Sequence, residues 1–159
     1  MKNYIILFFC FLFGFEIYSQ VPVEEWSQFI GTSGNDDTRS VVSTPDGGCL
    51  VLGTRSSSFD GDATCFNGLS DIWLFKFNSL GAIEWQRCYG GSHAEEGRSI
   101  INVGDDYLIV GTANSEDGDL TSHYGSNSLG EIWVIKIDSE GNILWQRTYG
   151  GSSSDWAMA

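Results

Sequence analysis

Aspartates in two glycine-containing segments are the residues of this sequence best placed to do chemistry. Asp60-Gly61-Asp62 recurs as Asp117-Gly118-Asp119. Calcium binds several closely spaced carboxylate and amide oxygens, so these loops predict a calcium site. Alternatively, the side chains bond to nearby backbone and shape turns on a solvated acidic surface. The EF-hand spacing is missing, and both interpretations stay open for the candidate ligands Asn114, Glu116, Asp117 and Asp119 in one copy and Asp60 and Asp62 in the other.

A second acidic group lies in the segments that connect one repeat to the next. Asp36 and Asp37 correspond in position to Glu95 and Glu96, and Trp156 aligns with Asp37 and Glu96. In a four-stranded antiparallel sheet, these connections leave from the same end as the loop between the second and third strands. We therefore predict one strongly acidic rim that contacts a ligand through Asp36, Asp37, Glu95, Glu96 and Trp156.

The other reactive side chains do not form a recognisable catalytic set. His93 and His123 have no repeat counterpart and no nucleophile motif beside them. Lys76 and Lys136 lie in apolar segments and are expected to pair with carboxylates. The cysteines Cys49, Cys65 and Cys88 follow the N-terminal segment without a Cys-x-x-Cys pair, which disfavours zinc. They allow one disulfide of open pairing, or three buried thiols. We expect no catalytic residue and no cofactor other than calcium.

Composition excludes several classes of protein. The 159 residues include 8 Lys and Arg against 21 Asp and Glu, which gives a net charge of −13. Nucleic-acid binders carry a basic face, so no nucleic-acid partner is expected. Aromatic residues make up 14% of the chain, which argues against disorder. Twenty glycines among these aromatics favour β-strands joined by tight turns.

The N-terminus predicts export. Residues 1–19 combine Lys2 with the apolar run Ile5–Phe15 and end at Ser19. The run is shorter than the about 20 residues that a transmembrane helix needs. This pattern is typical of a cleaved signal peptide. We therefore expect a protein that is secreted or displayed at the cell surface, with no membrane span in the mature chain.

A repeat of about sixty residues organises the rest of the chain. Trp26, Trp85 and Trp145 stand 59 and 60 residues apart, and Asp71-Ile72-Trp73 recurs as Glu131-Ile132-Trp133. Each unit contains four strand-like segments, which in the second unit span 98–103, 107–112, 132–137 and 142–149. Four antiparallel strands per repeat predict an all-β fold of β-propeller blades.

The repeat boundaries predict an incomplete propeller. We assign an orphan N-terminal strand to 20–31, a first blade to 32–90, a second blade to 91–150 and the start of a truncated blade to 151–159. A propeller closes with at least about four blades. We therefore expect an N-terminal fragment of a longer protein, whose remaining blades are partners of the two present here.

The repeated motifs resemble those of a known class of proteins. The segments Asp46–Thr54, Asp71–Phe77 and Gly81–Ser92 are similar to repeats of secreted β-propeller proteins of Bacteroidetes-type bacteria, which are associated with type IX secretion. This resemblance implies an exported propeller without known catalytic residues. The turn Asp138–Trp145 resembles the blade-docking turn of quinoprotein propellers, which implies that its tryptophan packs between blades.

These observations lead to two expectations about function. The first is an exported, non-catalytic scaffold or recognition module that binds a surface protein or a glycan through the acidic rim. The alternative is the N-terminal part of a propeller enzyme, hydrolase or quinoprotein-like, whose active site lies in missing blades or domains.

Overall fold

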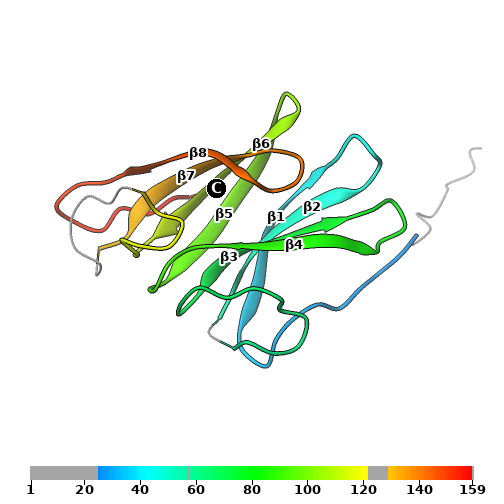
Figure 1. Ribbon diagram of the computed structural model, residues 1–159, viewed down its shortest axis with the longest axis horizontal. Helices are drawn as coiled ribbons and strands as arrows, with labels where there is room; N and C mark the ends of the chain where they lie inside the picture. Colours follow the sequence, from blue (N-terminus) through cyan, green and yellow to red (C-terminus); the bar gives the residue numbers. More distant parts are fainter. Residues whose placement is uncertain (1–24, 57, 122–128, 159) are drawn as a thin grey trace, which may run out of the picture.

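The computed structural model describes residues 25–56, 58–121 and 129–158. This part of the chain forms eight β-strands and no helix (Figure 1), which confirms the all-β prediction. The predicted signal peptide and residues 20–24 of the predicted orphan strand lie outside the described residues. No helix able to span a membrane is found in the described ranges.

The strands form two four-stranded antiparallel sheets in sequential order. The first sheet contains β1 (Asp36–Ser43), β2 (Cys49–Arg55), β3 (Asp71–Phe77) and β4 (Ile83–Tyr89). The second sheet contains β5 (Glu95–Val103), β6 (Asp106–Ala113), β7 (Glu131–Ile137) and β8 (Ile143–Tyr149).

The third strand of each sheet is apolar on both sides, and this decides where the sheets pack. In β3 all seven residues are buried, whereas in β7 burial alternates along the strand. Successive side chains of a strand point to opposite faces. Among the described residues, both faces of the first sheet are therefore covered, and only one face of the second sheet is.

The two sheets share one hydrophobic core. The first sheet contributes four fully buried side chains, and the second packs against them around Trp133. Ile72 lies directly over Gly111, since a Cβ placed on that glycine would be 2.9 Å from Ile72 Cδ1. Tyr89 donates a hydrogen bond of 2.7 Å to the carbonyl oxygen of Gly141 in the opposite hairpin turn. The packed residues are Leu50, Leu52, Ile72 and Leu74 against Ile109, Trp133, Ile135 and Ile137.

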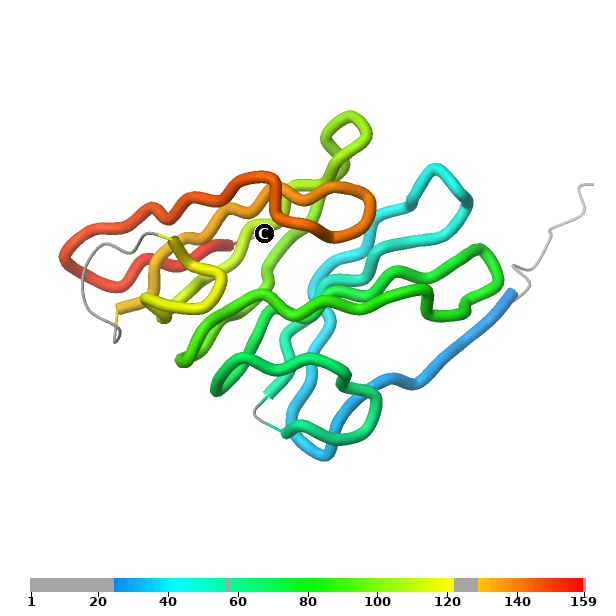
Figure 2. Tube along the Cα trace, viewed as in Figure 1, coloured from blue at the N-terminus to red at the C-terminus, as the bar shows by residue number. Residues whose placement is uncertain are grey.

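The N-terminal segment covers the other face of the first sheet. In Figure 2 this blue segment runs past the sheet before the chain enters β1. Trp26 stacks on Phe77 with ring centroids 5.6 Å apart and lies over Gly81, as Trp85 lies near Gly141. Residues 25–31 have no regular secondary structure. They nevertheless contact the first sheet in the way that β4 contacts the second sheet.

Covalent and ionic contacts reinforce the first sheet. Cys65 forms a disulfide with Cys88, which ties the loop after β2 to the end of β4. Lys76 pairs with Asp46 at 2.6 Å and with Glu84 at 2.9 Å, as expected for a lysine in an apolar strand. This pairing with Lys76 also holds the pKa of Asp46 below its usual range.

Candidate functional site at the acidic rim

The acidic residues gather at the end of the sheets where the long loops leave. The loops that follow β2 and β6 lie here, together with the connections that precede β1 and β5. We call this region the acidic rim and define it by residues 31–37, 56–70, 90–96 and 114–121.

The first aspartate loop, residues 60–62, is bonded to the connection before β1. Asp60 accepts hydrogen bonds from the Ser33 amide at 2.7 Å and from the Ser33 hydroxyl at 2.5 Å. Asp62 accepts one from the Gly31 amide at 3.0 Å, and its own amide donates to the Gly31 carbonyl. The bonds from Ser33 lower the pKa of Asp60.

The second aspartate loop, residues 117–119, repeats this arrangement in the second unit. Asp117 accepts a hydrogen bond of 2.7 Å from the Ser92 amide, and Asp119 accepts one of 3.1 Å from the Gly90 amide. The Asp119 amide donates to the Gly90 carbonyl at 3.0 Å. Hydrogen bonding from Ser92 lowers the pKa of Asp117. Each aspartate loop therefore fastens onto the segment that introduces its own unit.

The central glycine of each loop is required by this contact. Gly61 and Gly118 have φ values of 58° and 68°, in the left-handed region. A Cβ at either position would lie 2.3 Å from a carbonyl oxygen, that of Gly31 or that of Gly90. A larger residue would therefore push the loop away from its partner segment.

The structure brings only some of the residues predicted to bind calcium together. Asp117 and Asp119 line a hollow of about 160 Å³ together with Asn67 and the segment 90–92. Asn114 lies apart from them, where its amide donates to Ala94 O and Glu95 Oε1, and Glu116 is exposed to solvent. The described residues contain no group of three or more His, Cys, Asp or Glu side chains arranged to hold a metal ion. The aspartate side chains bond to a segment 25 to 31 residues away and not to their own turns, and the calcium site stays a prediction.

The predicted ligand-contacting residues are brought together in part. Asp36, Asp37 and Glu96 line one hollow of about 180 Å³. Glu95 is fully buried instead, and its carboxylate accepts bonds from the amides of Gly91, Asn114 and Ser115. Trp156 is half exposed and lines a small hollow of about 40 Å³ beside Glu96 and Asn114. His123 lies outside the described residues.

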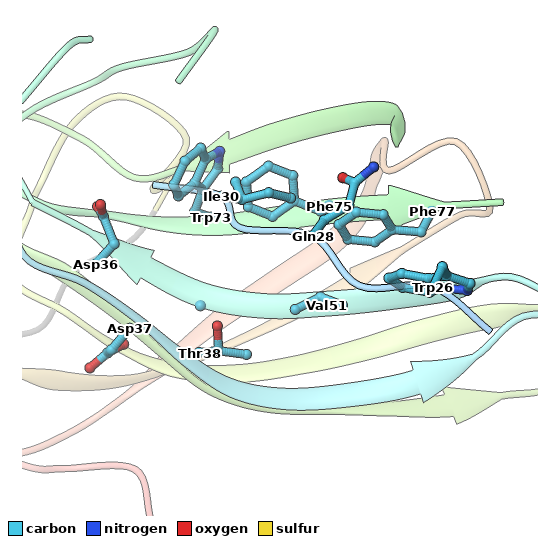
Figure 3. A pocket seen from close by; sticks show the side chains of 11 residues that line it. Trp26, Gln28, Ile30, Asp36, Asp37, Thr38, Val51, Trp73, Phe75 and Phe77 are labelled. Atoms are coloured by element: carbon cyan, nitrogen blue, oxygen red, sulfur yellow. The ribbon is translucent and has the colours of Figure 1, made fainter. Parts of the chain in front are cut away.

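A larger pocket of about 240 Å³ lies on the first sheet beneath the N-terminal segment. Figure 3 shows Trp73, Phe75, Phe77 and Trp26 in a row, with Thr38 and the carboxylate of Asp37 on the opposite side. Gly53 lines this pocket. Its counterpart in the second sheet is Gly111, which is covered by Ile72 of the first sheet. The correspondence between Gly53 and Gly111 is the sequence signal for this pocket.

A buried ionic group next to the rim was not predicted from the sequence. Arg55 and Asp71, both fully buried, face each other across β2 and β3 at 3.2 Å. Arg55 also donates to the carbonyls of Cys65 and Ser58 and lies 4.8 Å from the Phe66 ring centroid. A charged pair at the edge of a predicted strand is compatible with a solvated end, so burial was not predicted.

No protein-family model matches this chain. No curated protein matches it either.

Proposed function

We propose that this chain is an exported, non-catalytic β-propeller scaffold or recognition module that acts at the cell surface or outside the cell. Its two sheets are two blades, and its acidic rim binds a surface protein or a glycan. Export rests on the signal-peptide pattern of residues 1–19. The observation that carries the blade assignment is the repetition of one packing and one loop contact in consecutive units.

The uncovered face of the second sheet supports stacking of a further blade. Leu108, Val110, Ile132 and Val134 are half-buried there, whereas their counterparts in the first sheet are fully buried under the second sheet. Tyr149 is 51% exposed, while its counterpart Tyr89 is 3% exposed. Exposed apolar patches of this kind mark interaction sites. Further repeat units are therefore the partner that this face fits.

Residues 151–158 support the same assignment. The Ala157 amide donates to the Thr112 hydroxyl at 3.3 Å, as the Gly97 amide donates to the Thr54 hydroxyl at 3.1 Å. The Asp155 amide donates to the Gly130 carbonyl, as the Glu95 amide donates to the Ser70 carbonyl. This segment thus follows the path that residues 91–98 take into β5.

The charge of the rim indicates the chemistry of a rim ligand. Asp37, Asp60, Asp62 and Asp117 are exposed, and the whole chain carries a charge of −13. Complementary charge on a partner speeds encounter and selects the docking orientation. We therefore expect a ligand with cationic groups, carried by a basic protein segment or an amino-sugar glycan.

Calorimetric titration of the full chain with a lysine-rich peptide and with chitosan hexamers tests this proposal. We expect at least one of these ligands to bind, and the double variant Asp37→Asn with Glu96→Gln to weaken binding about tenfold. The matched control Asp105→Asn removes an exposed carboxylate at the opposite end of the sheets and should bind as the unaltered chain does. Equal weakening in both variants, or no binding of either ligand, would reject a rim-specific role.

A further inference from the structure

We propose that Asp71 and Glu95 share one proton and that this carboxyl pair makes the junction between the two sheets sensitive to pH. Asp71 begins β3 in the first sheet, and Glu95 begins β5 in the second. Both side chains are fully buried. The pair lies inside the junction, so it does not depend on whether the rim binds a ligand.

Gly90 shows that the two carboxylates converge. A Cβ placed on this glycine would lie 2.5 Å from Glu95 Oε2 and 2.7 Å from Asp71 Oδ1. The two oxygens therefore approach the same point beside the Gly90 backbone. Two ionised carboxylates that border one point of a buried site repel each other, and this repulsion favours retention of a proton.

The hydrogen-bond partners indicate which oxygen carries that proton. Glu95 accepts three backbone amides, from Gly91 on Oε2 and from Asn114 and Ser115 on Oε1. Asp71 Oδ2 accepts bonds from Arg55 and from the Asn67 amide. Asp71 Oδ1 is buried and has no hydrogen-bond partner among the described residues. A proton on Oδ1 turns this oxygen into a donor that faces the Glu95 carboxylate.

The charged groups around Asp71 favour its neutral form on balance. Burial is the main cause that raises its pKa, and the negative charges of Glu95 and Asp119 act in the same direction. The Asn67 amide and the Arg55 guanidinium act in the opposite direction and only partly offset it. These groups come from β2, β5 and the loops that follow β2 and β6.

The pair is built into the contact between the sheets. The Glu95 amide donates to the Ser70 carbonyl at 2.9 Å, and Ser70 forms a parallel bridge with Ala94. A similar convergence recurs at Gly150, where a Cβ would lie 3.0 Å from Glu131 Cγ and 3.1 Å from Asp155 Oδ2. In the second sheet Ala113 takes the place that Arg55 has opposite Asp71. The acidic pair thus recurs without the arginine, which argues that it is not merely a by-product of the Arg55 ion pair.

The sign of the pH effect follows from the raised pKa of Asp71. The folded chain binds this proton more tightly than the unfolded chain, so its contribution is fully present below the ordinary aspartate pKa of 3.8. It is lost as the pH rises through the higher pKa of the folded state. The junction should therefore be weaker at neutral pH than at mildly acidic pH, as far as this pair is concerned.

Carbon-13 NMR titration of the full chain, labelled at its carboxyl carbons, tests the proposal directly. Asp71 should titrate above the ordinary aspartate pKa of 3.8, and Glu95→Gln should bring its midpoint down. If Glu95→Gln does not fold, the pH dependence of unfolding in Asp71→Asn serves instead. A midpoint for Asp71 at or below 3.8 would overturn the shared proton.

Equilibrium unfolding across pH gives an independent measurement. The Asp71→Asn variant keeps the shape and offers an amide hydrogen in place of the proton. The ratio of its unfolding constant to that of the unaltered chain should fall as the pH rises through the folded-state pKa of Asp71. If calcium raises the melting temperature of the unaltered chain at neutral pH but not that of Asp71→Asn, a bound cation and not a shared proton neutralises the carboxyl pair. That result would overturn the proposal.

Discussion

Single hydroxyl and amide groups decide the ionisation of the rim aspartates. Asp60 is exposed, yet its pKa is lowered because the Ser33 hydroxyl and amide both donate to its carboxylate. Hydrogen bonds to the charged form of a carboxylate favour that form. The hydrogen bonds from Ser33 therefore have two effects: they hold the first aspartate loop against the segment before β1, and they favour the charged form of Asp60.

Removal of the Ser33 hydroxyl should raise the pKa of Asp60. In the unaltered chain the lowered pKa stabilises the fold above the ordinary aspartate value of 3.8, and this contribution is lost as the pH falls through the folded-state pKa. Ser33→Ala should shrink that contribution, because it removes the main cause of the shift. Carbon-13 NMR titration of Asp60 measures the effect, with Ser154→Ala as a surface control. An unchanged Asp60 midpoint in Ser33→Ala would refute this account.

At the residue level, the repeat spacing indicates which residues lie near one another at the rim but not which of them are buried. Asp36, Asp37 and Glu96 do meet at one hollow, because repeat spacing places corresponding residues at the same end of the sheets. Glu95 belongs to the same predicted group but is fully buried. The backbone amides that bond its carboxylate include those of Asn114 and Ser115, which lie 19 and 20 residues away, and no local pattern encodes these contacts.

At the scale of elements, each long loop is held by backbone contacts to the segment before its own unit. The strands themselves were predictable, since β6 and β7 fall within one residue of the predicted segments 107–112 and 132–137. The contacts of the aspartate loops were not, because their partners are amides whose position depends on how the units fold. The Cys65–Cys88 disulfide was one of three pairings that the cysteine count left open.

A substitution at Gly118 should test the fit of the second aspartate loop. Gly118→Ala should destabilise the chain by about 2 kcal/mol or more, because it combines an unfavourable φ with a collision against Gly90. Gly104 is the matched control, since its φ is also positive at 67° but nothing lies within 4 Å of an added Cβ. Gly104→Ala should therefore cost only about 1 kcal/mol. Chemical unfolding measures both, and equal losses would show that the contact with Gly90 contributes nothing.

At the scale of the whole molecule, corresponding residues of the two sheets differ in what covers them. Ile72 is fully buried under the second sheet, whereas its counterpart Ile132 is half-buried on the uncovered face. The two residues are chemically identical and pair with corresponding tyrosines, Tyr89 and Tyr149. The difference between them therefore isolates the energetic effect of the neighbouring sheet.

Truncation of these two isoleucines should give unequal losses of stability. Ile72→Ala should cost about 2–5 kcal/mol, because it leaves a cavity in the shared core. Ile132→Ala should cost about 1 kcal/mol, because less apolar surface is buried there. Unfolding at low protein concentration measures both. Similar losses would mean that the face of the second sheet is already covered, for example by self-association, which sedimentation at the same concentration would reveal.

The fastening of each aspartate loop to the segment before its own unit has a consequence for how such a chain grows in evolution. A duplicated unit contains its own aspartate loop, such as residues 117–119. It also contains or adjoins an equivalent binding segment, such as residues 90–92. Neither copy needs compensating substitutions elsewhere. Tandem duplication therefore adds a unit whose loop contacts are already satisfied. Deletion of half a unit would leave an aspartate loop, or the segment that it binds, without its hydrogen-bond partners.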